Sequence, residues 1–181
     1  MRFKYSFALL FAFLTLQLAA QQTSFRISYD IANLDIPGYI IQNPAGNYVF
    51  AGTNANFIPL YGNVTQIDSL GNVIWSKGYS GGSVATDIWD IKNVSGGGYI
   101  TAGSTGSGVM LMRLDANGAV TWSNRYHITS GTNEYSSRVL PTSDGGFVVA
   151  GYVHGATPPS STKQDSANFF CLKVNSSGTF Q

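Results

Sequence analysis

The sequence predicts an all-β protein, and three observations lead to this class. A unit of about 50 residues recurs three times after residue 20, and each copy holds short apolar runs separated by turn residues. The chain contains 21 glycines, 11 phenylalanines and 10 tyrosines, whereas charged residues make up only 10%. No helical period of apolar residues is visible beyond residue 20. This combination is typical of many short strands joined by tight turns.

Residues 1–20 have the order of a secretory signal peptide. Arg2 and Lys4 form a basic N-terminal region, residues 7–16 form an apolar region, and Leu-Ala-Ala at 18–20 provides small residues for a cleavage site. The apolar run is shorter than the roughly 20 residues that span a bilayer, which disfavours the alternative of a retained membrane anchor. We therefore expect export of a mature chain, residues 21–181, with no integral membrane span after signal cleavage.

Each unit is most regular in its second expected strand. These strands read GNYVFAGT, GGYITAGS and GGFVVAGY, and a polar and then an apolar stretch before each one predicts a first strand. Third strands follow at 62–68, 109–115 and 169–175. Asp68, Asp115 or Asn175 then opens a turn that ends in glycine, because such side chains bond the backbone downstream and glycine accepts positive φ.

A fourth strand completes the first two units. It reads NVIWSKGY at 72–79 and AVTWSNRY at 119–126, with a tryptophan four residues before a tyrosine. Phe25 and Tyr29 have the same spacing and predict a lone leading strand at 24–30. Twelve strands are therefore expected in the mature chain.

Four short strands in a repeat of this length fit a blade of a β-propeller, in which twisted sheets pack face to face around an axis. A blade buries its faces only between neighbours, so the recurring aromatics are expected to form the core between blades. The expected segments are a leading strand (24–30), blade 1 (36–79), blade 2 (86–126) and an incomplete blade 3 (134–181).

The blade count is low for a closed ring, which needs about four to eight blades. We therefore interpret the chain as a partial propeller of about three blades, truncated inside the fourth strand of the third. The alternative is a short chain that self-associates through its open blade edges. A stable, discrete oligomer in solution would favour that alternative.

The run GGYITAGST followed by MRLDANGAVTW resembles the repeats of bacterial secreted β-propeller proteins, whose blades read GGY-apolar-apolar-AG and then K/R-L-D-x-x-G-x-x-x-W. The resemblance covers about residues 24–181. It implies a secreted or outer cell-surface location, often reached by the type IX secretion system with a separate C-terminal sorting domain. Asn175 replaces the turn aspartate in the third unit, and no sorting domain is visible in this sequence.

Charge and reactive residues exclude several functions. Without Arg2 and Lys4 the chain holds eight basic and nine acidic residues, so no basic stripe is available for nucleic acid. Cys171 cannot form an internal disulfide and is expected as a small buried side chain. His127 and His154 are expected in loops without further ligands, so we expect no metal and no cofactor.

Two groups of residues remain as candidates for function. Carboxylates near the expected first strands, Asp87, Asp90 and Glu134, lie where a propeller lines its channel. The loop after the second strand is longest in the third unit, and long loops on a rigid scaffold often carry recognition, although surface loops also lengthen at small cost. We take as binding candidates His154, Pro158, Pro159, Lys163, Asp165 and Trp89.

The sequence leaves three functions open. The first is a non-catalytic scaffold that binds a protein or a polysaccharide at the cell surface. The second is a carbohydrate-active hydrolase or lyase that uses channel-facing acids, for which two carboxylates must face one another across a sugar. The third is a structural spacer within a larger surface protein. A fold alone does not choose among them.

Overall fold

A computed structural model describes residues 24–29, 35–54, 60–80, 86–106, 108–128, 133–154 and 167–181. These residues form eleven antiparallel strands and no helix, and none of these segments is an apolar helix of membrane-spanning length. The strands are β1 (Asp35–Gln42), β2 (Tyr48–Asn54), β3 (Tyr61–Ile67), β4 (Val73–Tyr79), β5 (Thr86–Asn93), β6 (Tyr99–Thr105), β7 (Gly108–Leu114), β8 (Val120–Tyr126), β9 (Asn133–Pro141), β10 (Phe147–His154) and β11 (Ala167–Val174).

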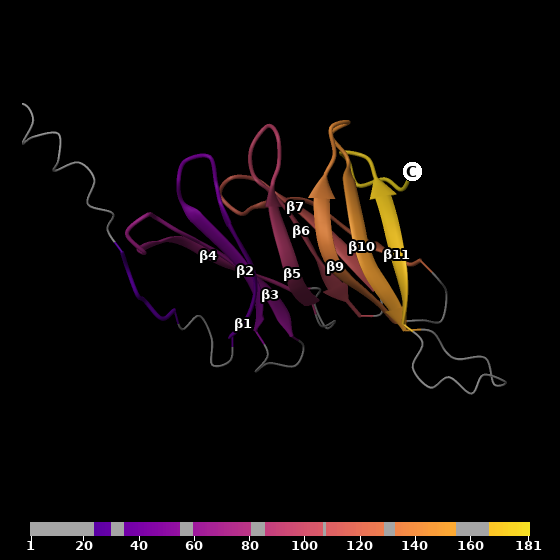
Figure 1. Ribbon diagram of the computed structural model, residues 1–181, viewed down its shortest axis with the longest axis horizontal. Coiled ribbons are helices and arrows are strands. Elements are labelled where there is room, and N and C mark those ends of the chain that lie inside the picture. The colour runs from indigo at the N-terminus through magenta and orange to yellow at the C-terminus, as the bar shows by residue number, and fades with distance from the viewer. Residues whose placement is uncertain are drawn as a thin grey trace, which may run out of the picture.

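The strands form three sheets, each a meander of sequential neighbours. Two sheets have four strands, in the orders β1-β2-β3-β4 and β5-β6-β7-β8, and the third has the order β11-β10-β9. Figure 1 shows the sheets side by side in chain order, from the purple β1–β4 sheet to the orange and yellow β9–β11 sheet. The predicted all-β class and the four-strand unit are therefore confirmed.

The turn between the last two strands of each unit is built as the sequence predicts. The Oδ1 atom of Asp68 accepts hydrogen bonds from the N–H groups of Leu70 and Asn72, both at 2.8 Å. Asp115 and Asn175 accept the equivalent pairs in the next two units. The turn glycines have φ of 91°, 75° and 79° at Gly71, Gly118 and Gly178, a region that costs other residues free energy.

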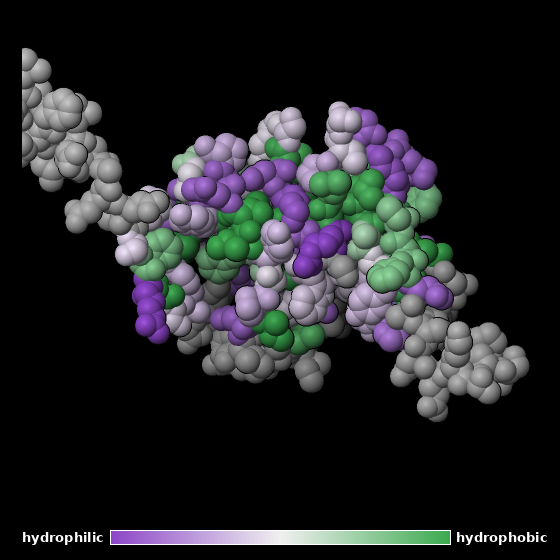
Figure 2. Space-filling model, viewed as in Figure 1, coloured by the Kyte–Doolittle hydropathy of each residue, from purple (hydrophilic) through white to green (hydrophobic). Residues whose placement is uncertain are grey.

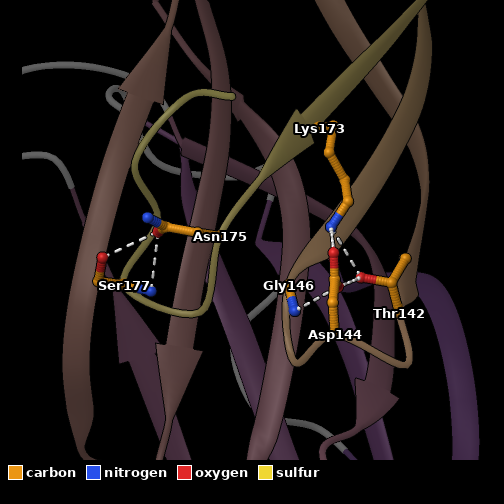
Figure 3. A network of polar contacts seen from close by, with 6 residues as sticks. All are labelled: Thr142, Asp144, Gly146, Lys173, Asn175 and Ser177. Atoms are coloured by element: carbon orange, nitrogen blue, oxygen red, sulfur yellow. Dashed lines mark hydrogen bonds and ion pairs between the residues drawn. The ribbon is translucent and has the colours of Figure 1, made fainter.

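A charged side chain fixes the β9–β10 turn (Figure 3). Lys173 of β11 places its Nζ 2.7 Å from Oδ2 of Asp144 and 3.0 Å from the hydroxyl of Thr142. Asp144 also accepts a hydrogen bond of 3.0 Å from the N–H of Gly146. The single charge of this strand therefore ties the strand to the neighbouring turn.

The glycine of each AG pair is required by a backbone contact. β1, β5 and β9 each carry an irregularity in register opposite this pair. There the neighbouring backbone comes so close that an added Cβ would lie 2.5 Å from the carbonyl oxygen of Ile36 at Gly52 and 1.7 Å from that of Asp87 at Gly103. At Gly151 the distance to the carbonyl oxygen of Tyr135 would be 2.1 Å. The repeated glycine thus permits the bulged first strand.

Aromatic and aliphatic side chains join successive sheets, as the repeat predicts. Val49, Ala51 and Val64 of the first sheet belong to one buried cluster with residues of β5, β6 and β7. The Trp75 ring lies 6.3 Å from the Tyr99 ring of the next sheet. The equivalent contact of the next pair of sheets joins Trp122 to Phe147 at 6.0 Å.

Tyrosine hydroxyls lock the same interfaces. Tyr79 donates to the carbonyl oxygen of Gly118 at 2.8 Å, and Tyr126 donates to that of Gly178 at 2.6 Å. Tyr29 donates in the same way to the carbonyl oxygen of Gly71, at 2.6 Å. Residues 24–29 do not form a strand, but they lie against the β1–β4 sheet. Phe25 contacts the Tyr48 ring and Tyr29 donates to Gly71, which are the contacts that β4 and β8 make to the sheets that follow them.

Two placements expected from the sequence are wrong. Cys171 is exposed, not buried, because the β9–β11 sheet has one face that no other described part of the chain covers. His154 lies in β10, paired with Asn133 and Ala167, and not in a loop.

Candidate functional site

A cavity of about 340 Å³ opens where β5, β9 and β10 meet. β5 and β9 are the first strands of consecutive sheets, and they contact each other directly. The residues that line the cavity are Asp87, Trp89, Tyr135, Ser136, Arg138 and Tyr152. Aromatic rings, an acid and a guanidinium therefore surround one hollow.

The irregular first strands produce this arrangement. The register of β5 shifts between Ile88 and Asp90, so Trp89 is the extra residue of a bulge. The register of β9 shifts at the equivalent place, between Ser136 and Arg138. A bulge bends its strand and redirects the side chains beside it. The same bulges that require the AG glycines thus shape the walls of the cavity.

Aromatic rings form one wall of the cavity. Tyr135 and Tyr152 are cross-strand partners, and their rings stack with centroids 5.2 Å apart and planes 22° apart. The ring of His154 meets both edge-on, at 6.1 Å from Tyr135 and 5.5 Å from Tyr152. Stacked and edge-on pairs of this kind hold rings in fixed orientations. The wall is therefore a preformed apolar surface with polar tips.

The charged groups of the cavity differ in environment. Asp87 is half-buried, and this burial raises the pKa of its carboxyl group above the ordinary value. Arg138 is exposed, with its guanidinium carbon 5.4 Å from the centre of the Tyr39 ring. Ser136 is occupied structurally, since its hydroxyl donates to the carbonyl oxygen of Gly103 at 2.7 Å. Among the described residues, one carboxyl group and one permanent cation therefore line the cavity.

Two other acids from the sequence analysis serve the backbone. Asp90 is fully buried, and its Oδ2 accepts a bond of 2.9 Å from the N–H of Val139 in the next sheet. Glu134 is also fully buried, and its Oε1 accepts a bond of 2.6 Å from the N–H of Ile128. A buried carboxylate that satisfies backbone donors is a structural anchor. Neither is among the residues that line the cavity.

The structure thus brings together part of the expected site. Trp89 and Asp87 line the cavity, and His154 contacts its wall through Tyr152. The remaining candidates, Pro158, Pro159, Lys163 and Asp165, lie outside the described residues.

Tyr135, Tyr152 and Arg138 were not among the candidates predicted from the sequence. A signal for the tyrosines was available, because the residue after the AG glycine is Thr53 or Ser104 in the other two units and Tyr152 in the third. The residue opposite it is likewise an aromatic only in the third unit. Tyr135 and Tyr152 thus depart from the repeat at two positions that face each other across the strands. Because the other two sheets pack without aromatic pairs at these positions, the packing between sheets does not explain the two tyrosines.

Side chains of the metal-ligating types do not cluster among the described residues. Within them, no three side chains of the His, Cys, Asp and Glu types lie close enough together to hold a metal ion. The Nδ1 atom of His127 lies 3.5 Å from Oε2 of Glu134. Neither residue is among those that line the cavity, and Oε1 of Glu134 accepts its hydrogen bond from the backbone.

No protein-family model matches the chain, and no curated protein matches it. Among solved structures, the chain is similar to a protein of unknown function from Bacteroides caccae, known from a crystal structure at 1.35 Å resolution. The two are 10% identical with a TM-score of 0.34, over 86% of this chain and 68% of that chain. At this TM-score the likeness says nothing about function.

Proposed function

We propose that the chain is a secreted, non-catalytic scaffold of the β-propeller type that binds a polysaccharide at the cell surface. The observation that carries the proposal is the cavity between β5 and β9, where Trp89 and the stacked tyrosines lie beside Asp87 and Arg138. Sugar rings combine apolar faces with hydroxyl groups at their edges. Aromatic rings can pack on the apolar faces of a sugar, and a carboxyl group and a guanidinium can form hydrogen bonds with its hydroxyl groups.

The arrangement of the sheets supports a propeller. Consecutive sheets pack through equivalent residues, and the first strand of each sheet contacts the first strand of the sheet before it, β5 with β1 and β9 with β5. A propeller has this relation among its innermost strands. In that arrangement the cavity faces the central channel, and Trp89 and Arg138 line its wall.

A sugar fits the cavity better than a protein does. A volume of about 340 Å³ is near the lower limit for a small-molecule site. A protein partner would instead need about 800 Å² of surface on each side. We therefore place the binding of one or two sugar units in this cavity.

The test is binding of purified chain to an array of bacterial and host polysaccharides, followed by calorimetry on the best glycan. Trp89→Ala and Tyr152→Ala should each weaken binding at least tenfold, because each removes an aromatic wall of the cavity. Leu70→Ala is the matched control, since Leu70 is an exposed apolar residue on a turn away from the cavity. If a glycan binds and both cavity variants bind it as well as Leu70→Ala does, the proposed site is wrong.

A carbohydrate-active hydrolase or lyase is the second candidate, and one observation favours it. Burial raises the pKa of Asp87, and a raised pKa suits a carboxyl group that donates a proton. Among the described residues, Asp87 is the one carboxylate that lines the cavity, whereas hydrolysis of a glycoside ordinarily uses two. Turnover of a glycan that Asp87→Asn abolishes without loss of binding would establish the enzyme over the scaffold.

Export rests on the expected signal peptide, residues 1–20. Expression of the full chain in a bacterium that secretes such proteins should yield a product that begins near Gln21, as N-terminal sequencing would show. A product retaining residues 1–20 would contradict secretion.

A further inference from the structure

The face of the β9–β11 sheet that points away from the other sheets carries exposed apolar side chains, and no other described part of the chain covers it. We call it the C-terminal face and define it by Leu140, Val148, Ala150, Phe169 and Cys171. The cavity residues Arg138 and Tyr152 lie on the same side of the sheet, opposite Ala150 and Phe169. Leu140 is 61% exposed and Phe169 is 96% exposed. Figure 2 shows hydrophobic residues, in green, gathered over β10 and β11.

The same positions in the other sheets are buried. Strand pairing aligns Phe169 with Val109 of the second sheet, and Cys171 with Leu111. Val109 and Leu111 are both 0% exposed, because the third sheet covers them. Phe169 and Cys171 therefore occupy positions that are buried in the second sheet, but no described sheet covers them in the third.

The opposite end of the molecule carries the complementary face. We call it the N-terminal face, and it lies on the β1–β4 sheet around a hollow of about 470 Å³ lined by Phe25, Tyr29, Ile40, Tyr48 and Phe50 among others. Ile40 is 58% exposed, whereas its equivalents Ile91 and Val139 are 0% and 2% exposed.

Each internal interface joins these two kinds of face. The second sheet covers the first by placing Ile88 and Ile91 against Val49, Ala51 and Val64. The third sheet covers the second through the equivalent positions, with Val139 and Phe147 in one cluster with Ile100 and Ala102. A C-terminal face and an N-terminal face are thus a pair that the chain already forms twice.

The strand edges are complementary as well. Residues 24–29 make the contacts of a fourth strand, through Phe25 and Tyr29, but they pair with no described strand. β11 lies at the edge of a sheet of three strands, where Phe180 forms one isolated bridge to Val174. An open edge pairs readily with an extended segment from another chain. Figure 1 shows residues 24–29 and β11 at opposite ends of the molecule.

We infer that a second copy of this chain covers these faces. The C-terminal face of one copy packs on the N-terminal face of the other, and residues 24–29 of one copy add as the fourth strand to β11 of its partner. Such a contact is heterologous, because it joins two different faces. The assembly is therefore a closed ring only when the C-terminal face of the last copy meets the N-terminal face of the first. Two copies give six sheets, within the range of closed propellers. The number of copies rests on the ring arrangement proposed above, whereas the interface rests on the exposed faces.

The repeat also gives the register of the new strand pair. In the second sheet Leu111 lies opposite Asn124, and these two residues correspond to Cys171 and Ile27. Opposite residues of antiparallel strands have Cα atoms about 4.5 to 5.5 Å apart, which is within the range for a disulfide. An Ile27→Cys variant should therefore form a disulfide with Cys171 of the other copy on mild oxidation.

The experiment combines solution mass with this cross-link. Light scattering of the purified chain should give twice the mass of one chain, and Ile27→Cys should give a covalent dimer on a non-reducing gel. Arg26→Cys is the matched control, because the adjacent residue points to the other side of the strand and should cross-link at least tenfold less. Phe169→Asp should yield a monomer, whereas Leu70→Asp, at an exposed residue outside both faces, should remain a dimer.

Each other outcome overturns the inference. A wild-type monomer would mean that some other partner covers the two faces. Equal cross-linking of Ile27→Cys and Arg26→Cys would contradict the strand register. Polymers of increasing length would show the same faces in an open filament and would overturn the closed pair of copies. The solution mass and the cross-link are measured without a glycan. A chain that binds no glycan would therefore refute the proposed function and leave this test of the interface unchanged.

Discussion

Replacement of Gly103 by alanine tests the origin of the repeated AG pair. Gly103 has no positive φ, so alanine suits its backbone conformation. The added Cβ would lie 1.7 Å from the carbonyl oxygen of Asp87, whereas ordinary contact begins at 3.4 Å. The two strands would have to separate by the difference, about 1.7 Å. A separation of that size breaks hydrogen bonds of the β5–β6 ladder.

The expected cost follows from these contacts. Overpacking costs about 1 to 3 kcal/mol, and each ladder hydrogen bond lost adds about 1 kcal/mol. We expect Gly103→Ala to lower the free energy of unfolding by at least 3 kcal/mol. Gly151→Ala and Gly52→Ala should cost progressively less, because their closest backbone distances are 2.1 and 2.5 Å.

Urea unfolding followed by tryptophan fluorescence measures these differences. A loss of about 3 kcal/mol moves the midpoint by about 1 to 3 M urea for typical slopes. Gly78→Ala is the matched control, since Gly78 is also in a strand but its added Cβ would meet only the Tyr61 ring, at 3.3 Å. That variant should stay within about 0.5 kcal/mol of wild type. If Gly103→Ala unfolds at the same urea concentration as Gly78→Ala, the backbone contact does not explain the glycine.

Three further predictions concern the polar contacts within and between sheets. Tyr79→Phe removes the hydrogen bond to Gly118 and should lower the free energy of urea unfolding by about 1 kcal/mol. Asp90→Ala leaves buried N–H groups without their acceptor and should cost about 3 kcal/mol in the same assay. Lys173 and Thr142 hold the pKa of Asp144 well below its ordinary 3.8, so the stability that Asp144 contributes is present above pH 4 and is lost as pH falls through the lowered pKa. Asp144→Asn should therefore melt below wild type at pH 7, and melting curves recorded towards pH 2 should converge; parallel curves would contradict the contact.

Much of the fold was predictable because each local signal has a short-range cause. Asp68 and Asp115 bond the turn backbone two and four residues ahead, so their spacing from glycine reports the turn directly. Trp75 with Tyr79 recurs as Trp122 with Tyr126 because both pairs meet the same positions of the next sheet.

The two wrong placements depend on the surroundings of the third sheet, which the sequence of a single repeat does not encode. Cys171 occupies a position that is buried in the first two sheets, and its own strand gives no sign that the third sheet lacks a covering neighbour. His154 follows an apolar strand and precedes polar residues, so its pairing in β10 depends on partners distant in sequence.

The candidate site was only partly predictable for a related reason. Asp87, Asp90 and Glu134 look alike in sequence, but the β5 bulge turns Asp90 into the interface while Asp87 lines the cavity. Tyr135 and Tyr152 become a wall only through cross-strand pairing.

The reactivity of Cys171 towards a thiol reagent tests most directly whether each sheet face of this chain needs a neighbour. Cys171 lies on the C-terminal face, so its thiol should be protected when the chain is concentrated and two copies associate. On dilution it should react at the rate of an exposed thiol, and Phe169→Asp should react at that rate at every concentration. A fast reaction at all concentrations of the wild-type chain would contradict the stacking of these faces.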